Sequence, residues 1–283
     1  MHTFLLILVT IIWGSTFFIV KDAVSSVNEY FLVFGRTLIA AIVMILIILF
    51  TNKKSLLNKK AIINGSILGI LLATTYISQT IGLKYTSTGH SAFITGSAVI
   101  VVPILLYLFY KEKILKSDLF SVFVVLIGLL LLTYDFNTKI NIGDLITLIT
   151  ALAYANHVIL AGKFVKNTDI LAMIAYQFLT ASVFSFLIFI LTNQSFPVLE
   201  IKSVISITYL GFIGTLFCYF ISIWVQKYVS SIKVALIFTL EPIFAAFFGY
   251  LVLRETLNIK EMTGALLILF GITLYQVLKS KFK

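Results

Sequence analysis

Residues 83–88 read Leu-Lys-Tyr-Thr-Ser-Thr, and residues 226–231 repeat the pattern as Gln-Lys-Tyr-Val-Ser-Ser, 143 positions further along the chain. The same displacement relates further pairs in the same order: Tyr76 to Tyr219, Lys111-Glu112 to Arg254-Glu255 and Gly128 to Gly271. Earlier in the two halves, a displacement of 141 pairs Trp13-Gly14 with Tyr154-Ala155. Because the matches keep their order at a nearly fixed distance, they indicate an internal repeat of two halves.

The composition around these motifs is that of a membrane protein. Of the 283 residues, 60% are hydrophobic and only 11% are charged, whereas a soluble domain has about 25% charged residues. A helix needs about 20 apolar residues to cross the hydrocarbon core, and the apolar runs lack the alternation of barrel strands. We therefore predict an all-α polytopic membrane protein with ten transmembrane helices, at about residues 3–20, 31–50, 61–83, 88–110, 119–134, 145–162, 170–192, 204–226, 231–253 and 262–278.

The ten predicted helices divide into two repeats of five, residues 1–139 and residues 140–283. Five is an odd number, so the second repeat must enter the membrane from the side opposite to the first. Two inverted halves can form two nearly equivalent arrangements, one open to each side of the membrane. This is the design of an alternating-access transporter whose site lies near the middle of the membrane, between the halves.

Lysine and arginine residues predict the sidedness of the chain. Fourteen of the 21 lie in the loops and tail that share a side with both termini, six lie on the other side, and Arg36 lies inside a span. By the positive-inside rule, both termini of this multi-pass protein are in the cytoplasm, and the membrane is the cytoplasmic membrane. The basic residues form short clusters between apolar runs, so the net charge of +10 does not indicate nucleic-acid binding. The single cysteine, Cys218, excludes an internal disulfide and a cysteine-based metal site.

Three stretches resemble an EamA-type domain of the drug/metabolite transporter superfamily. They are Trp13-Gly14-Ser15-Thr16-Phe17, the run Ala92-Phe93-Ile94-Thr95-Gly96 followed by Val101-Val102-Pro103 and Lys111-Glu112, and residues 240–250 (Leu-Glu-Pro-Ile-Phe-Ala-Ala-Phe-Phe-Gly-Tyr) followed by Arg254-Glu255. The likeness covers essentially the whole chain as two tandem domains. It implies ten helices in an inverted five-plus-five repeat, and export or exchange of small metabolites such as amino acids.

The sequence departs from that pattern in two places. Tyr154 stands where the second-half copy of the first motif would have tryptophan. The proline lies nine residues before Glu112 but thirteen residues before Glu255. We therefore expect the fourth and ninth helices to differ by about one helical turn, which argues against strict symmetry of the site.

Glu241 is the most informative single residue. It lies at the middle of the ninth span, where an unpaired charge costs at least about 2.5 kcal/mol. One interpretation is a carboxylate that faces a cavity and binds an amine or a coupling proton. The other is a protonated acid or a packing hydrogen bond beside Pro242, whose ring leaves a backbone carbonyl free.

His157 continues a polar stripe of the sixth helix formed by Thr147, Thr150 and Tyr154. Such a stripe should face the interior of the bundle or water. A hydrogen-bonded histidine between helices is the plainer interpretation, and proton exchange near neutral pH is the functional one.

The other candidate substrate-binding residues are aromatic and hydrogen-bonding side chains about one helical turn apart. Together with Glu241 and His157 they form the predicted site: Trp13, Thr16, Tyr76, Gln79, Thr95, Tyr154, Tyr219 and Ser222. We interpret Arg36 as structural, either reaching outward to the membrane surface or paired with Glu29. Gly65 and Gly69 form a small-residue motif for close helix approach. Lys111-Glu112 and Arg254-Glu255 are interpreted as gate or cap residues at the ends of spans.

The predicted function is secondary active transport of a small amphipathic metabolite by alternating access. No phosphate-binding loop, zinc-protease motif or nucleophile elbow is present, so we expect neither an enzyme nor a bound cofactor or metal. The alternatives are an intramembrane enzyme acting on lipid and a channel-like facilitator. The expected partners are the substrate, the lipid bilayer and, as an open point, protons. The chain could act as a monomer or as a homodimer.

Overall fold

The computed structural model describes residues 1–135, 139–253 and 258–281, and every regular element in these ranges is helical. Ten helical segments in the described ranges are long and apolar enough to cross a membrane, as predicted. Eight of the elements precede residue 170: α1 (His2–Ala23), α2 (Glu29–Thr51), the short η1 (Lys53–Leu57), α3 (Lys59–Tyr85), α4 (Thr88–Gly96), α5 (Ala98–Tyr110), α6 (Lys116–Thr133) and α7 (Ile142–Phe164). The others are α8 (Ile170–Leu191), α9 (Ile201–Tyr209), η2 (Leu210–Phe217), α10 (Cys218–Val225), α11 (Ser231–Phe238), α12 (Glu241–Phe248), η3 (Gly249–Leu253) and α13 (Ile259–Lys281).

Polar caps at the loop ends set where several helices begin. The Asn28 side chain accepts from the backbone N–H groups of Tyr30 and Phe31 at the start of α2. At the start of α7, Asn141 and Asp144 form a reciprocal capping box. These side chains satisfy backbone donors that the first turn of a helix leaves free. The start of these two spans is therefore marked by a cap in the sequence as well as by the apolar run that follows.

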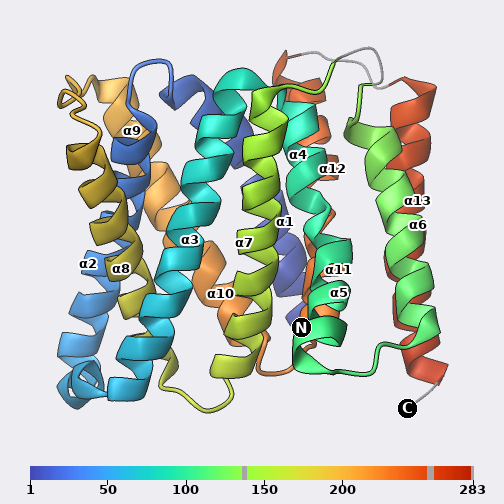
Figure 1. Cartoon of the computed structure of the whole chain (residues 1–283), viewed down its shortest axis with the longest axis horizontal. Helices are drawn as coiled ribbons and strands as arrows, with labels where there is room; N and C mark the ends of the chain where they lie inside the picture. The colour runs from blue at the N-terminus through green and yellow to red at the C-terminus, as the bar shows by residue number, and fades with distance from the viewer. Residues whose placement is uncertain (136–138, 254–257, 282–283) are drawn as a thin grey trace.

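The two halves run in opposite directions through the bundle. Both chain ends lie toward the same face, and α1 and α7, which open the two halves, start from opposite faces (Figure 1). Helix α1 packs against α11 and α12 of the second half, and α7 packs in the same way against α4 and α5 of the first. Helix α2 packs against α8, and α6 against α13, so corresponding helices of the two halves also meet each other. This pattern of contacts is that of an inverted repeat.

Two spans that the sequence predicts as continuous are interrupted in the structure. The fourth span changes from α4 to α5 at Ser97, and the ninth changes from α11 to α12 at Thr239 and Leu240. At both interruptions a backbone N–H group donates a hydrogen bond to the carbonyl oxygen three residues earlier. Ser97 donates to Ile94, and Thr239 donates to Leu236. The displacement of 143 takes residues 96 and 97 to residues 239 and 240. The interruptions are therefore in register. The expected offset is in the position of the proline, because Pro103 lies six residues after Ser97 whereas Pro242 lies two residues after Leu240.

The eighth span is also irregular, because its middle third, η2, is a π-helix. Helices of this type are rare and occur frequently at functional sites. The span begins at Ile201 and the tenth at Ile259, each three residues earlier than predicted. Irregular backbone is tolerated at membrane depth only where it is buried in protein or lines a cavity.

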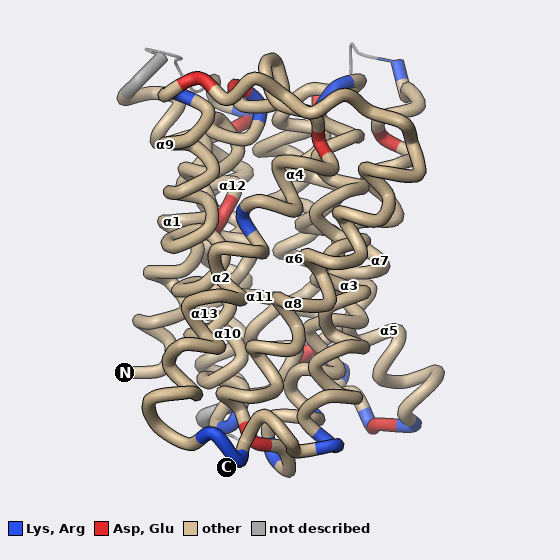
Figure 2. Tube along the Cα trace, turned by 90° about the vertical axis from the view of Figure 1, so that its left-hand side faces the viewer, with Lys and Arg blue, Asp and Glu red and all other residues tan. Residues whose placement is uncertain are grey.

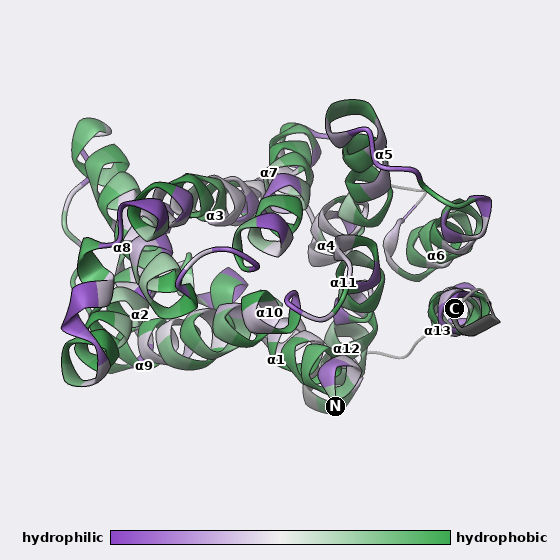
Figure 3. Ribbon diagram, turned by 90° about the horizontal axis from the view of Figure 1, so that it is seen from below, coloured by the Kyte–Doolittle hydropathy of each residue, from purple (hydrophilic) through white to green (hydrophobic). Residues whose placement is uncertain are grey.

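The outer surface of the bundle is apolar and its two ends are polar. Many large hydrophobic side chains remain exposed, among them Phe50, Tyr107 and Phe123, and hydrophobic residues cover the outer sides of the helices (Figure 3). Most lysine, arginine and acidic residues gather at the two ends (Figure 2). This distribution matches a hydrocarbon layer around the helices, with water at both ends.

Helices α3 and α8 approach each other through the predicted small-residue motif. A Cβ atom on Gly65 would lie 2.4 Å from the carbonyl oxygen of Met173, and one on Gly69 would lie 2.5 Å from that of Gln177. No side chain fits at these distances, so glycine allows the two backbones to touch. The contact joins the third helix of the first half to the second helix of the second half.

Candidate substrate-binding site

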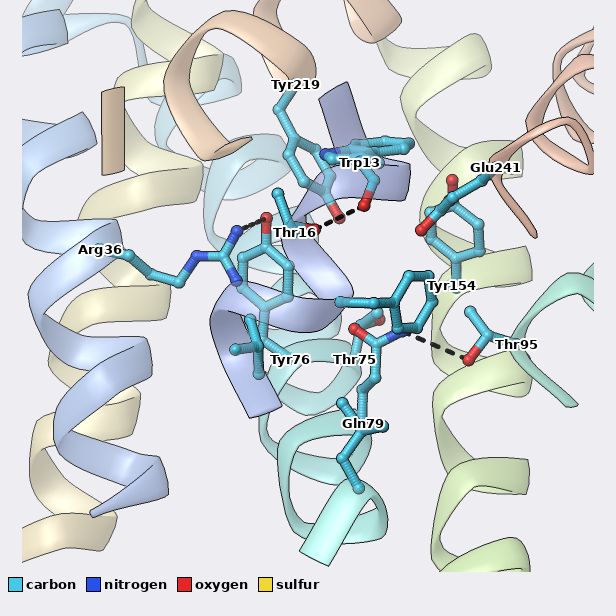
Figure 4. A pocket seen from close by; sticks show the side chains of 13 residues that line it. Trp13, Thr16, Arg36, Thr75, Tyr76, Gln79, Thr95, Tyr154, Tyr219 and Glu241 are labelled. Carbon is cyan, nitrogen blue, oxygen red and sulfur yellow. Dashed lines mark hydrogen bonds between the residues drawn. The ribbon is translucent and has the colours of Figure 1, made fainter. Parts of the chain in front are cut away.

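A cavity lies between the two halves and is lined by side chains from both of them (Figure 4). Its walls come from α1, α2, α3 and α4 of the first half and from α7, α10 and α12 of the second. The lining residues are Trp13, Thr16, Phe17, Val20, Arg36, Thr75, Tyr76, Gln79, Leu83, Thr95, Tyr154, Tyr219 and Glu241. The structure therefore brings together all but two of the predicted site residues.

Trp13, Tyr154 and Tyr219 line one wall of the cavity and form an aromatic cluster with Phe238, which packs against Trp13 and Tyr154. The Trp13 ring centroid lies 5.3 Å from that of Tyr219 and 5.0 Å from that of Phe238, in tilted and edge-on arrangements. The Trp13 indole nitrogen donates to the carbonyl oxygen of Gly214 over 2.9 Å. This bond fixes the ring against η2, so the irregular part of the eighth span supports the wall of the cavity.

Glu241 is the first residue of α12 and lies directly after the interruption of the ninth span. Its side chain lines the cavity from the side of the second half, near Tyr154 (Figure 4). Within the described ranges, its carboxylate makes no hydrogen bond and no ion pair. The Tyr154 hydroxyl is buried and likewise has no hydrogen-bond partner in the described part of the chain. Neither polar group is thus satisfied by the described residues.

Polar side chains of α3 and α4 meet at another edge of the cavity. The Gln79 amide donates to the Thr95 hydroxyl over 3.4 Å, which links the third and fourth spans. The Thr16 hydroxyl instead donates to the carbonyl of Trp13 within its own helix, over 2.8 Å. Gln79 and Thr95 thus add hydrogen-bonding groups to a cavity whose other walls are largely aromatic.

His157 and Ser222 belong to the predicted site but do not line the cavity. The His157 Nε2 atom lies 2.9 Å from Oε1 of Gln177, and the ring packs edge-on against Tyr219. The Ser222 hydroxyl donates to the carbonyl of Cys218 over 2.6 Å. The plainer interpretation of His157, a hydrogen-bonded histidine between helices, therefore fits its surroundings.

Arg36 lines the cavity, which corrects both sequence-based expectations for it. It does not reach outward, because its side chain is buried, and Glu29 pairs with Lys84 instead. Thr75, one residue before Tyr76, also lines the cavity but is not among the site residues predicted from the sequence. A signal for Arg36 was present in the sequence, since a cation inside a predicted span is costly unless it faces a partner or a cavity.

Of the two basic-acidic pairs at span ends, the structure describes only Lys111-Glu112. Glu112 accepts a hydrogen bond of 2.9 Å from Lys163, which ties the segment after α5 to the end of α7. Lys111 adopts the left-handed conformation, with a φ of 52°, as the C-cap of α5. The first pair therefore caps and ties helix ends. Arg254-Glu255 lies outside the described residues.

The described residues hold no group of three His, Cys, Asp or Glu side chains that could bind a metal ion.

Comparison with known proteins identifies the family. The model of the EamA-like transporter family matches this chain twice, over residues 2–134 and 141–276. The chain belongs to the EamA-like transporter family.

Several relatives of this EamA-like transporter align over nearly its whole length. An uncharacterized transporter of Archaeoglobus fulgidus is 28% identical over 94% of this chain and 83% of its own. The uncharacterized transporter YoaV of Bacillus subtilis is 26% identical over 94% of both chains. An S-adenosylmethionine/S-adenosylhomocysteine transporter of Chlamydia muridarum is 22% identical over 90% of this chain and 85% of its own. A solved crystal structure with a TM-score of 0.82 and 14% identity covers 99% of this chain and 98% of that one, which supports the fold alone.

Proposed function

We propose that this EamA-like transporter is a secondary active exporter or exchanger of small amphipathic metabolites such as amino acids. The observation that carries the proposal is the cavity itself, which lies between two inverted halves and borders the interrupted ninth span. Discontinuous helices at the interface of inverted repeats are where secondary transporters bind their substrates. Rocking of one half against the other would expose such a site to each side in turn.

Glu241 is the residue that we assign to the cationic group of the substrate. Its carboxylate lines the cavity without a partner in the described ranges, and the aromatic cluster beside it suits an apolar side chain. A primary amine would offset the cost of keeping this charge away from water. A coupling proton would do the same when no amine is bound, so the same carboxylate could serve proton exchange.

We further propose that both termini face the cytoplasm and that the membrane is the cytoplasmic membrane. The proposal rests on the 14-to-6 distribution of lysine and arginine in the sequence and on the two chain ends sharing one face (Figure 1). We place the division between the two domains at residues 139 and 140. The cavity lies within one chain, so a single copy would suffice for transport.

Counterflow in reconstituted vesicles tests the proposed function. A screen of amino acids, nucleosides and cationic drugs for compounds that raise the melting temperature of the purified protein supplies the ligands. A ligand found in this way should show saturable uptake that is accelerated by unlabelled ligand inside the vesicles. Uptake without this acceleration would indicate a channel-like facilitator instead.

Tyr76→Ala and Tyr219→Ala should each reduce counterflow at least about tenfold, because each removes an aromatic wall of the cavity. The matched control is Tyr107→Ala, since the Tyr107 side chain is 64% exposed on the outer surface. All three variants should insert into the membrane normally. Unchanged flux in Tyr76→Ala and Tyr219→Ala would remove these residues from the site.

A further inference from the structure

Arg36 is a buried cation that has no buried anion beside it among the described residues. Its residue exposure is 3%, it lies on α2 and it lines the cavity. No carboxylate in the described ranges lies within the 4.0 Å that defines an ion pair with it. An unpaired ion costs several kcal/mol when it is taken out of water. A side chain with a purely structural role would be expected to have a protein anion as its partner.

The surrounding residues hold the guanidinium in a fixed orientation. Its Nε atom donates to the Thr215 hydroxyl over 2.9 Å, and Nη2 donates to the Tyr76 hydroxyl over 3.1 Å. The central carbon of the guanidinium lies 3.9 Å from the centroid of the Tyr76 ring. Gly214 leaves room for this arrangement, because a Cβ atom there would lie 3.3 Å from Nη2. The contacts come from α3 and η2, so both halves position the cation.

Several donors of this guanidinium remain available to a ligand. The group carries five N–H bonds, and the hydrogen bonds to Thr215 and Tyr76 account for two of them. No acceptor in the described part of the chain takes the remaining donors. Because the side chain lines the cavity, a planar anion there could receive two parallel hydrogen bonds from it. A carboxylate has the matching geometry.

The opposite charge lies across the same cavity. Arg36 enters from α2 on one side, and Glu241 enters from α12 on the other (Figure 4). Thr215 and Tyr76 hold the cation in place, while the carboxylate directly follows an interrupted helix. The two charged groups do not meet within ion-pairing distance, so neither of them neutralises the other.

We propose that Arg36 is a specificity-determining residue that binds the carboxylate of the substrate, so that only compounds carrying both a carboxylate and an amine bind tightly. The inference rests on the proposed function, in which Glu241 binds the amine. Compounds with only one of the two groups leave either the guanidinium or the Glu241 carboxylate unpaired in the cavity. The aromatic cluster then contacts the apolar part of the bound zwitterion.

Ligand-induced stabilisation of the purified protein tests this inference. The probes are the twenty amino acids, each compared with its amine-only and carboxylate-only counterpart of the same carbon skeleton. At least one amino acid should raise the melting temperature, while both of its counterparts give no shift at the same concentration. An equal shift from the amine-only counterpart overturns the proposal, and so does a panel in which no amino acid gives a shift.

Variants of Arg36 separate binding from packing. Arg36→Gln should weaken binding of the amino acid about 10- to 100-fold, as expected when hydrogen bonds to a charged group are lost. Arg36→Lys keeps the charge without the planar fork and should bind with intermediate affinity. Lys202→Gln is the matched control, because Lys202 forms an exposed ion pair with Asp22. If Arg36→Gln lowers the melting temperature of the free protein but leaves ligand affinity unchanged, the residue is structural and the proposal is wrong.

Failure of this inference can be distinguished from failure of the proposed function. Counterflow of amine-only compounds at the rate of their amino acids would preserve transport and overturn the role of Arg36. Tight binding of zwitterions that depends on Arg36, together with vesicles that show no counterflow, would preserve the site and overturn transport.

Discussion

The Trp13 side chain connects the cavity to the irregular eighth span through one hydrogen bond. Trp13→Phe keeps an aromatic ring in the cluster but leaves the Gly214 carbonyl without its donor. An unsatisfied buried acceptor costs about 1–3 kcal/mol, so we expect the free energy of unfolding to fall by about this amount. Denaturant titration of the purified protein in mixed micelles measures the change.

The second tryptophan provides the control for this prediction. Trp224 packs against His2 and Tyr228, and its indole nitrogen makes no hydrogen bond with the described residues. Trp224→Phe should therefore change the free energy of unfolding by less than about 1 kcal/mol. Equal losses in the two variants would mean that ring size, and not the bond to Gly214, determines the effect.

At the scale of single residues, the sequence predicts the aromatic and polar lining well and the charged lining incompletely. Tyr76 and Gln79 could be paired because side chains one turn apart share a face of a helix. For Arg36 the sequence leaves two expectations, a side chain that reaches outward or a pair with Glu29. The sequence contains no indication that Lys84, at the far end of the next helix, takes this carboxylate. Contacts between helices, unlike those within one, are not visible from spacing.

At the scale of elements, the contact of α3 with α8 depends on the absence of side chains. Gly65→Ala would place a methyl group 2.4 Å from the Met173 carbonyl oxygen, so the two backbones would have to separate. Overpacking of this kind costs about 1–3 kcal/mol. We expect a corresponding loss in the free energy of unfolding, measured in the same micelle titration.

Gly35→Ala is the matched control for the α3–α8 contact. Its added methyl group would meet only side-chain atoms of Ile207, the nearest at 3.0 Å, and these can move. Alanine also favours a helix over glycine by about 1 kcal/mol. We therefore expect a neutral or slightly stabilising effect. A loss as large as that of Gly65→Ala would show that the close approach of the α3 and α8 backbones is not the cause of the effect at Gly65.

The interruptions of the fourth and ninth spans could be predicted only in part. Pro242 indicates an irregularity in the ninth span, since proline cannot donate the backbone bond that continues a helix. Pro103 lies inside α5, and the interruption of the fourth span occurs earlier, at Ser97. The backbone bond that Pro103 removes would run to Val99, so the proline does not account for the break at Ser97. The repeat displacement of 143 relates the positions of the two interruptions better than the prolines do, because it pairs residues in equivalent surroundings.

At the scale of the whole molecule, the inverted repeat determines which loops face each side of the membrane. An odd number of spans per half places equivalent residues on opposite sides, which a parallel repeat would not do. In the proposed transport mechanism, the same relative movement of the halves would open the cavity to either side. The sequence predicts this arrangement from the order of its motifs, whereas the contact between Trp13 and Tyr219 across the two halves is visible only in the fold.

Labelling of introduced cysteines tests the inversion directly. Cys218 is buried and is the only cysteine of the chain, so Cys218→Ser gives a background without reactive thiols. Ser25→Cys and Lys166→Cys then place a thiol at two exposed loop positions that the repeat displacement of 141 relates. In intact cells, a membrane-impermeant maleimide should label position 25, because the proposed orientation puts it outside. Position 166 should react only after the membrane is permeabilised. Labelling of both positions from the same side contradicts the inverted repeat, and the reverse pattern keeps the inversion but reverses the proposed orientation.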